Sequence, residues 1–97
     1  MRLVHTVSEL KEVLAEVRTE RSIGFVPTMG ALHKGHLSLI ERCQQDGNFT
    51  VVSIFVNPLQ FSSEADYEGY PRTLGVDARL LTDASVDVLF APSAAEV

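Results

Sequence analysis

The chain has little of several features that mark particular classes of protein. Cys43 is the only cysteine among the 97 residues, so no disulfide can form within the chain, and a reducing cytoplasm is the expected location. The 8 Lys and Arg stand against 13 Asp and Glu, and this net charge of −5 argues against a nucleic-acid partner, which normally requires a basic face. No segment approaches the length of a membrane span, and the N-terminus has no apolar run typical of signal peptides. We therefore expect a soluble intracellular domain that binds neither nucleic acid nor membrane.

The chain alternates between patterns typical of strands and patterns typical of helices. Its 45% hydrophobic and 22% charged residues are ordinary for one small globular domain. Strands are predicted over 2–5, 23–27, 50–56 and 87–91. Helices are predicted after Thr6, from the histidine-rich segment 33–36 onward and from near Thr73 to Ala84, with Gly47 ending the second. This alternation predicts an α/β fold with a Rossmann-like parallel sheet and flanking helices.

Two polar segments follow strands of this predicted sheet. Residues 27–29 come directly after the apolar strand 23–27, and residues 57–60 come after the β-branched strand 50–56. The second segment begins a loop that runs from Asn57 to about Arg72. This loop shows no periodicity, and loops of this length are often functional. Because ligands of parallel sheets bind outside the carboxyl ends of the strands, we expect the two segments to form one composite site.

The first of these segments contains two histidines at the predicted start of a helix. His33 and His36 are three residues apart, so they share a helix face, and Gly35 between them allows close approach to the backbone. A helix N-terminus favours phosphate, and imidazoles and free N–H groups can donate hydrogen bonds to it. We interpret the segment as a nucleotide site for chemistry at an α-phosphate, with His36 as the principal donor in the transition state.

Two other interpretations of the histidine pair remain open. Such a pair can be a surface or capping feature with no catalytic role. A zinc site would need a third and usually a fourth ligand, and neither His5 nor Cys43 stands at a ligand spacing. We therefore expect no metal site formed by histidine and cysteine.

At this point the residues resemble a known family. Pro27-Thr-Met-Gly-Ala-Leu-His-Lys-Gly-His36 is similar to the ATP-binding signature of the pantothenate synthetases, the pantoate–β-alanine ligases. The segments Ser53–Phe61, Tyr70–Thr73 and Val86–Pro92 also resemble this family, in the same order and spacing. Other nucleotidyltransferases with His-x-Gly-His usually place Gly-x-Phe-Asp before the histidines. A related nucleotidyltransferase is therefore an alternative with less support.

The resemblance implies an ATP-dependent ligase. Pantoate attacks the α-phosphate of ATP to give pantoyl adenylate and pyrophosphate, and β-alanine then displaces AMP. The implied catalytic residues are His33 and His36, which we expect to act by electrostatic stabilisation. The implied ATP-binding residues are Met29, Gly30, Ala31, Leu32, His33, Lys34, Gly35 and His36. Gln60, Met29 and Asn57 are implied for pantoate, and Gln60 also for β-alanine. Mg²⁺ is expected with ATP, and the family enzymes are commonly homodimers.

The chain also departs from the family. Leu59 stands where the family commonly has Met, a change that conserves volume. The family enzymes are much longer, so residues 1–97 correspond to the N-terminal part of the Rossmann-like ATP- and pantoate-binding domain. The Lys-and-Ser loop over the phosphates and the C-terminal lid domain have no counterpart here. We expect negligible turnover from this chain alone. A non-catalytic nucleotide- or pantoate-binding module, or a fragment that self-associates through an unpaired strand edge, is the alternative.

The remaining polar and aromatic residues near these motifs receive lesser roles. Phe61 is expected in the core or, alternatively, as a wall of the pantoate pocket. Tyr70 and Arg72 are expected to anchor the long loop. Glu64 and Asp77 are interpreted as solvated charges.

Overall fold

The computed structural model describes residues 1–93, so the last four residues of the predicted unit 1–97 lie outside the described residues. Within that range the chain forms the strands β1 (Arg2–Val4), β2 (Ile23–Thr28), β3 (Phe49–Ile54) and β4 (Val88–Phe90). The helices are α1 (Val7–Val17), α2 (Lys34–Gln45), the 3-10 turn η1 (Pro58–Gln60), α3 (Glu64–Gly69) and α4 (Leu74–Asp83).

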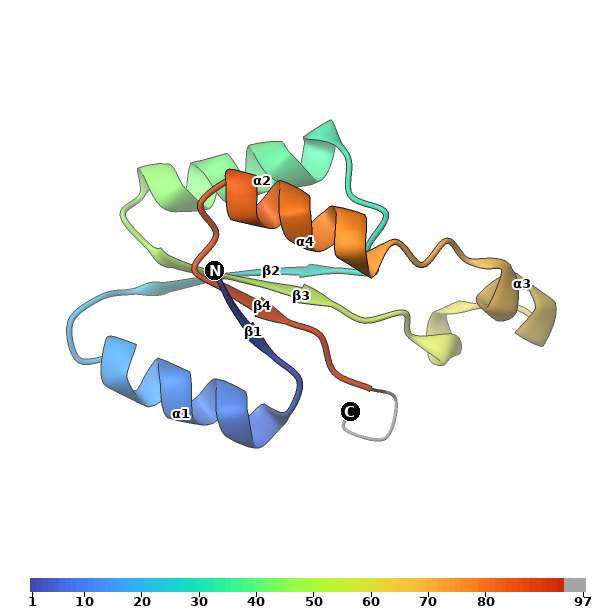
Figure 1. The fold of residues 1–97 in the computed structure, drawn as a ribbon, viewed down its shortest axis with the longest axis horizontal. Helices are drawn as coiled ribbons and strands as arrows, with labels where there is room; N and C mark the ends of the chain where they lie inside the picture. Colours follow the sequence, from blue (N-terminus) through green and yellow to red (C-terminus); the bar gives the residue numbers. More distant parts are fainter. Residues whose placement is uncertain (94–97) are drawn as a thin grey trace.

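The strands form one parallel sheet in the order β1-β4-β3-β2. Helix α1 covers one face of the sheet, whereas α2 and α4 lie side by side over the other, and α3 lies at one end of the molecule (Figure 1). The predicted α/β fold with a parallel Rossmann-like sheet is confirmed. Among the described residues, no helix is both long and apolar enough to cross a membrane.

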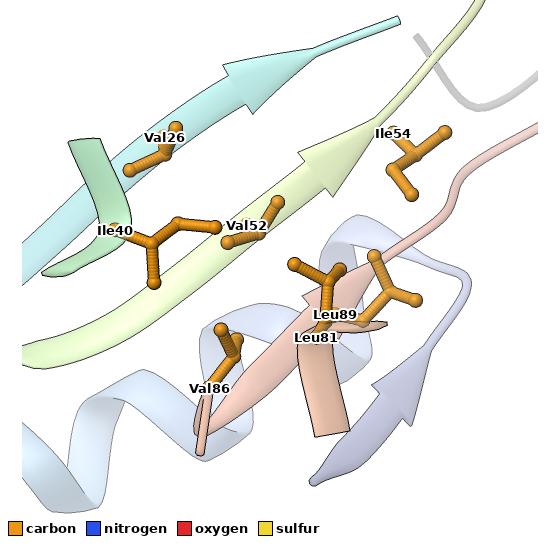
Figure 2. Packing of buried hydrophobic residues seen from close by; sticks show 7 residues of the cluster. All are labelled: Val26, Ile40, Val52, Ile54, Leu81, Val86 and Leu89. Carbon is orange, nitrogen blue, oxygen red and sulfur yellow. The ribbon is translucent and has the colours of Figure 1, made fainter. Parts of the chain in front are cut away.

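Strand β3 is one of the two inner strands of the described sheet, and its β-branched sequence predicted a strand here. Val51 packs into the cluster beneath α1, while Val52 and Ile54 pack into the cluster beneath α2 and α4. Successive side chains of a strand point to opposite faces, so β3 contributes to both clusters. The second cluster combines strand residues with Ile40 of α2 and Leu81 of α4 (Figure 2).

Strand β2, whose apolar sequence is typical of a buried strand of a parallel sheet, lies at an edge of the described sheet. It pairs with β3 and is the edge strand of the described sheet, with Phe25 52% exposed. An apolar run does not distinguish an edge strand from a central one, because sheet order depends on contacts distant in sequence.

The loop from Asn57 to about Arg72, whose sequence shows no periodicity, contains two short helical segments. Asn57 accepts a hydrogen bond from the N–H of Leu59 at 3.0 Å and begins η1, and Ser63 accepts one from the N–H of Asp66 at 3.1 Å and begins α3. Both are N-cap bonds, which Asn and Ser make readily. The six residues of α3 are too few to show a helical period, so their cap was the only signal available.

The start of α1 and the end of α2 lie where the sequence predicts them. Thr6 caps α1 by accepting from the N–H of Glu9 at 3.1 Å, as the capping-box pattern predicts. Gly47 follows α2 with a φ of +78°, the left-handed conformation that favours glycine after a helix.

A close contact between β2 and α2 requires glycine at position 24. A Cβ at Gly24 would overlap Sγ of Cys43 and would come within 3.2 Å of Cβ of Asn48. Cys43 is half-buried as a free thiol, so its sulfur fills the space that the missing side chain leaves.

We expect Gly24→Ala to lower the free energy of unfolding by about 1–3 kcal/mol, because overpacking forces neighbouring groups apart. Chemical denaturation followed by circular dichroism measures this. Gly75→Ala is the matched control, since a Cβ there meets no atom within 4 Å, and it should be neutral or slightly stabilising. Adding Cys43→Ala to Gly24→Ala should recover part of the loss. Wild-type stability for Gly24→Ala alone would contradict the contact.

Candidate functional site

The turn between β2 and α2 is held in an unusual backbone conformation. Gly30 and Ala31 have φ values of +84° and +51°, both in the left-handed region. Such a φ costs roughly 1–2 kcal/mol for a residue with a Cβ, so Ala31 needs support from its surroundings. Part of it comes from the Thr28 hydroxyl, which donates to the carbonyl of Ser53 at 2.9 Å and accepts from the N–H of Gly30 at 3.1 Å.

The two histidines cap helix α2 reciprocally. Nδ1 of His33 accepts from the N–H of Gly35 at 3.0 Å, and Nδ1 of His36 accepts from the N–H of His33 at 3.1 Å. The ring centroids are 4.1 Å apart. An imidazole nitrogen that accepts a hydrogen bond carries no proton, so each neutral ring carries its proton on Nε2. The capping role and the role of phosphate donor therefore use different nitrogens, and the two interpretations are compatible.

Gly35 is required by the His33 ring. A Cβ at Gly35 would come within 2.8 Å of Cε1 and 3.1 Å of Nδ1 of His33. The group that approaches the backbone of Gly35 is thus the side chain of His33. The glycine in His-x-Gly-His allows the first imidazole to fold back over the helix start.

The electrostatic environment keeps His36 neutral. Burial lowers the pKa of the His36 imidazole below its ordinary value of 6.5, and the adjacent His33 lowers this pKa further, while Asp77 acts in the opposite direction. A lowered pKa agrees with the geometry, because protonation of Nδ1 would remove the acceptor of the His33 N–H.

A cleft of about 630 Å³ lies at the carboxyl ends of β2 and β3. The strands are in register with Thr28 beside Ile54, so the segments that follow them leave the sheet at the same edge. The cleft is lined by Pro27, Thr28, Met29, Gly30, Ala31, His33, His36, Ser53, Phe55, Asn57, Gln60 and Tyr70. The structure thus brings the two histidines together with Asn57, Gln60 and Met29, which is the composite geometry expected from the topology.

Three of the residues expected at the nucleotide segment lie elsewhere or serve the turn itself. Leu32 packs against the core beneath α2 and α4, Lys34 is exposed, and Gly35 accommodates the His33 ring. In addition, the N–H groups of five residues of the segment already donate within the chain: Gly30, Ala31, Leu32, His33 and Gly35. The expected free N–H donors are therefore not found at these five positions.

Tyr70 and Arg72, which are expected to anchor the long loop, make their contacts within that loop. The guanidinium of Arg72 donates to the carbonyls of Tyr67, Glu68 and Tyr70 at distances of 2.8–3.2 Å. The Phe61 ring packs edge-on against Tyr67 and Tyr70, with centroids 5.5 Å apart in both pairs. Phe61 is half-buried against these rings and is not among the residues that line the cleft.

Asp77 is not the solvated charge that the sequence suggested; that interpretation is wrong. Its side chain is 2% exposed, and its carboxylate accepts from the N–H groups of Ala31 and Leu32 at 2.9 and 3.0 Å. The burial of Asp77 could have been predicted from its spacing, because Asp77 shares a helix face with Leu81 and Ala84, which both pack into the core. Glu64 is exposed, as expected.

The described residues do not fit a metal ion held by side chains. They contain no group of three His, Cys, Asp or Glu placed to hold one. Asp77 is the only carboxylate among the residues that line this cleft and the adjoining cavity of about 270 Å³, and its oxygens already accept three hydrogen bonds.

Known proteins have a similar fold and a similar sequence. A family model described as pantoate-beta-alanine ligase matches residues 2–97. The pantothenate synthetases of Brucella ovis and Brucella abortus are each 53% identical over 98 residues, which cover 100% of this chain and 33% of each relative.

Solved structures agree with these relatives. The pantoate-beta-alanine ligase of Francisella tularensis, complexed with beta-gamma ATP and beta-alanine, superposes with a TM-score of 0.93 at 42% identity and covers 99% of this chain and 37% of that one. The pantothenate synthetase of Thermus thermophilus has a TM-score of 0.80 at 49% identity, with 99% and 33% covered. The chain therefore spans about a third of the length of the relatives it matches, and it belongs to the pantoate–β-alanine ligase family.

Proposed function

We propose that the chain forms the ATP- and pantoate-binding part of a ligase that joins pantoate to β-alanine. The observation that carries this proposal is the cleft that unites two backbone-capped imidazoles with Gln60 and Asn57. Family membership supports it, and so does the Francisella tularensis relative, which was solved with an ATP ligand and beta-alanine.

In the first step a carboxylate oxygen of pantoate attacks the α-phosphorus of ATP. The bond from that phosphorus to the bridging oxygen breaks, pyrophosphate leaves, and pantoyl adenylate forms. Negative charge develops on the phosphoryl and leaving oxygens, and donors already oriented toward such charge lower the barrier. The Nε2–H groups of His33 and His36 are the proposed donors.

The residues after β3 are proposed to hold the hydroxy acid. The Gln60 amide can donate to a carboxylate oxygen and accept from a hydroxyl, which matches pantoate. Asn57 uses its side-chain oxygen to cap η1, so its NH₂ group is the part left for a substrate. Met29 lines both this cleft and the adjoining apolar cavity, and its flexible side chain suits the two methyl groups of pantoate.

In the second step the β-alanine amine attacks the acyl carbon of the adenylate. The bond from that carbon to the phosphate oxygen breaks, AMP leaves, the nitrogen releases a proton to water, and the amide of pantothenate forms. Gln60 is proposed to contact β-alanine as well, because the attacking amine must approach the carboxyl end of pantoate that Gln60 holds.

We propose that Mg²⁺ accompanies ATP, bound by triphosphate oxygens and water. Mg²⁺ usually keeps several waters and binds substrate phosphates together with one or two carboxylates, and no carboxylate is among the described side chains that line the cleft. A cytoplasmic location and a homodimer are likewise proposals for the whole protein, which rest on its free thiol at Cys43 and on the family resemblance respectively.

We expect the chain to bind ATP, and His36→Asn to weaken this binding about tenfold or more. Asparagine can place its side-chain oxygen near the position of Nδ1 and so retain the cap, but it removes the Nε2–H donor, and a bond to a charged acceptor is worth about 1.5–3 kcal/mol. Titration of ATP followed by NMR signals of the cleft measures the affinity. His5→Asn is the control, since His5 contacts the carbonyl of Ala91 and does not line the cleft. Equal ATP affinity of the His36→Asn and wild-type chains would exclude His36 as a donor.

The lowered pKa of His36 predicts a loss of stability in acid. Between the pKa of the folded state and the ordinary value of 6.5, the unfolded chain binds more protons, so the free energy of unfolding falls as the pH falls. The contribution of His36 is complete above pH 6.5 and decreases below it. Urea denaturation between about pH 5 and pH 8 should show a larger decrease for the wild type than for His36→Asn, which does not titrate. Parallel pH profiles of the two chains would show that His36 does not control this transition.

The exposed edge of β2 supports self-association as a second candidate property. Its outer side meets no other strand among residues 1–93, and Phe25 on it is exposed. Unpaired strand edges are sites of association between chains. Size-exclusion chromatography over a range of concentrations tests this, and a single monomer peak at high concentration would count against edge pairing.

A further inference from the structure

Asp77 is a buried carboxylate in the first turn of α4, facing the turn between β2 and α2. Its Oδ1 accepts from the N–H of Leu32 at 3.0 Å, and its Oδ2 accepts from the N–H of Ala31 at 2.9 Å and from the hydroxyl of Thr73 at 3.1 Å. The described residues give it no ion-pair partner. A buried charge is tolerated only when hydrogen bonds replace its water, and here three donors and the N-terminus of α4 do so.

The two backbone donors lie at the most constrained point of the turn. Ala31 has the left-handed φ, and Leu32 is the residue that returns the chain to the core beneath α2 and α4. A Cβ at Gly30 would come within 3.1 Å of Oδ2 of Asp77, so glycine there allows the carboxylate to approach. A strained conformation persists where several contacts determine it together, and Asp77 supplies two of them.

The position of both imidazoles follows from this turn. His33 comes directly after Leu32, and its N–H is the donor that orients the His36 ring through Nδ1. The His33 ring is in turn oriented by the N–H of Gly35. A rotation of the backbone at Ala31–Leu32 would therefore move the His33 N–H and displace both rings.

We propose that Asp77 is a positioning residue for the ATP site: from α4 it clamps the amides of Ala31 and Leu32 and so fixes the orientation of His33 and His36 toward the phosphates. This inference rests on the proposed function for the identity of the ligand. Asp77 acts through the turn and does not itself hold substrate, because its two oxygens are already committed to the three donors of the chain.

The experiment compares Asp77→Asn with Asp83→Asn, a control at an exposed acidic residue on the same helix. Asparagine keeps the size of Asp77 but presents an NH₂ group where an acceptor is needed, so one of the two amides loses its partner. Hydrogen exchange at the Ala31 and Leu32 amides, ¹⁵N signals of the imidazole nitrogens and the ATP affinity are measured on the full 97-residue chain.

For Asp77→Asn we expect exchange at Ala31 or Leu32 to accelerate at least tenfold and ATP affinity to fall at least tenfold. The pattern of protonation at Nδ1 and Nε2 should become a mixture, while the helical circular dichroism is retained. Asp83→Asn should match the wild type in all of these. Thr73→Val removes only the hydroxyl donor, so it should weaken ATP binding less than Asp77→Asn, and it serves as the test if Asp77→Asn does not fold.

Three results would overturn the inference. One is wild-type protection of both amides in Asp77→Asn. A second is wild-type ATP affinity in that variant, or in Thr73→Val where Asp77→Asn is unfolded. The third is a loss of stability spread evenly over the chain, with no selective change at Ala31, Leu32 and the imidazoles, which would give Asp77 a structural role only. If the wild-type chain binds no ATP, the proposed function fails, whereas the exchange and imidazole measurements still decide whether Asp77 clamps the turn.

Discussion

The burial of strand β3 on both faces is the constraint on which the rest of the structure depends. Its side chains alternate between the cluster beneath α1 and the cluster beneath α2 and α4, so both layers of helices are tied to one strand. β2 pairs with β3 in register from Ile23 to Thr28, and both strands therefore end at the same edge of the sheet. The histidine turn follows β2, and Asn57–Gln60 follows β3. These two segments therefore meet at the same edge of the sheet.

At that edge the same side chains support the fold and are suited to chemistry. Each imidazole uses Nδ1 to accept a backbone N–H at the start of α2, so in the neutral ring the proton is on Nε2. Burial and the proximity of the two rings keep His36 neutral. The proposed phosphate site would depend on oriented dipoles more than on net charge, so an acidic chain with a net charge of −5 is compatible with the proposal.

Much of the architecture was predictable because it rests on local patterns. The period of β3, the capping box of Thr6 and Glu9 and the glycine after α2 each depend on residues close in sequence. The expectation that the segments after β2 and β3 would share a site needed only the rule that parallel strands end together. The edge position of β2 and the partners of Asp77 were not predictable in this way, since both depend on elements far apart in the chain. Asp77 and Ala31, for example, are separated by 46 residues.

The sequence by itself determined the succession of strands and helices, the parallel α/β class, the family and the presence of two histidines at a helix start. These follow from periodicity and from a motif whose residues are contiguous. Only the tertiary structure decided which nitrogen of each imidazole is free, which backbone amides are already occupied, and that a carboxylate from α4 holds the histidine turn. The physical reason is that the hydrogen bonds of a buried group depend on which groups lie next to it in the folded chain. A local sequence pattern does not identify a neighbour that is distant in sequence.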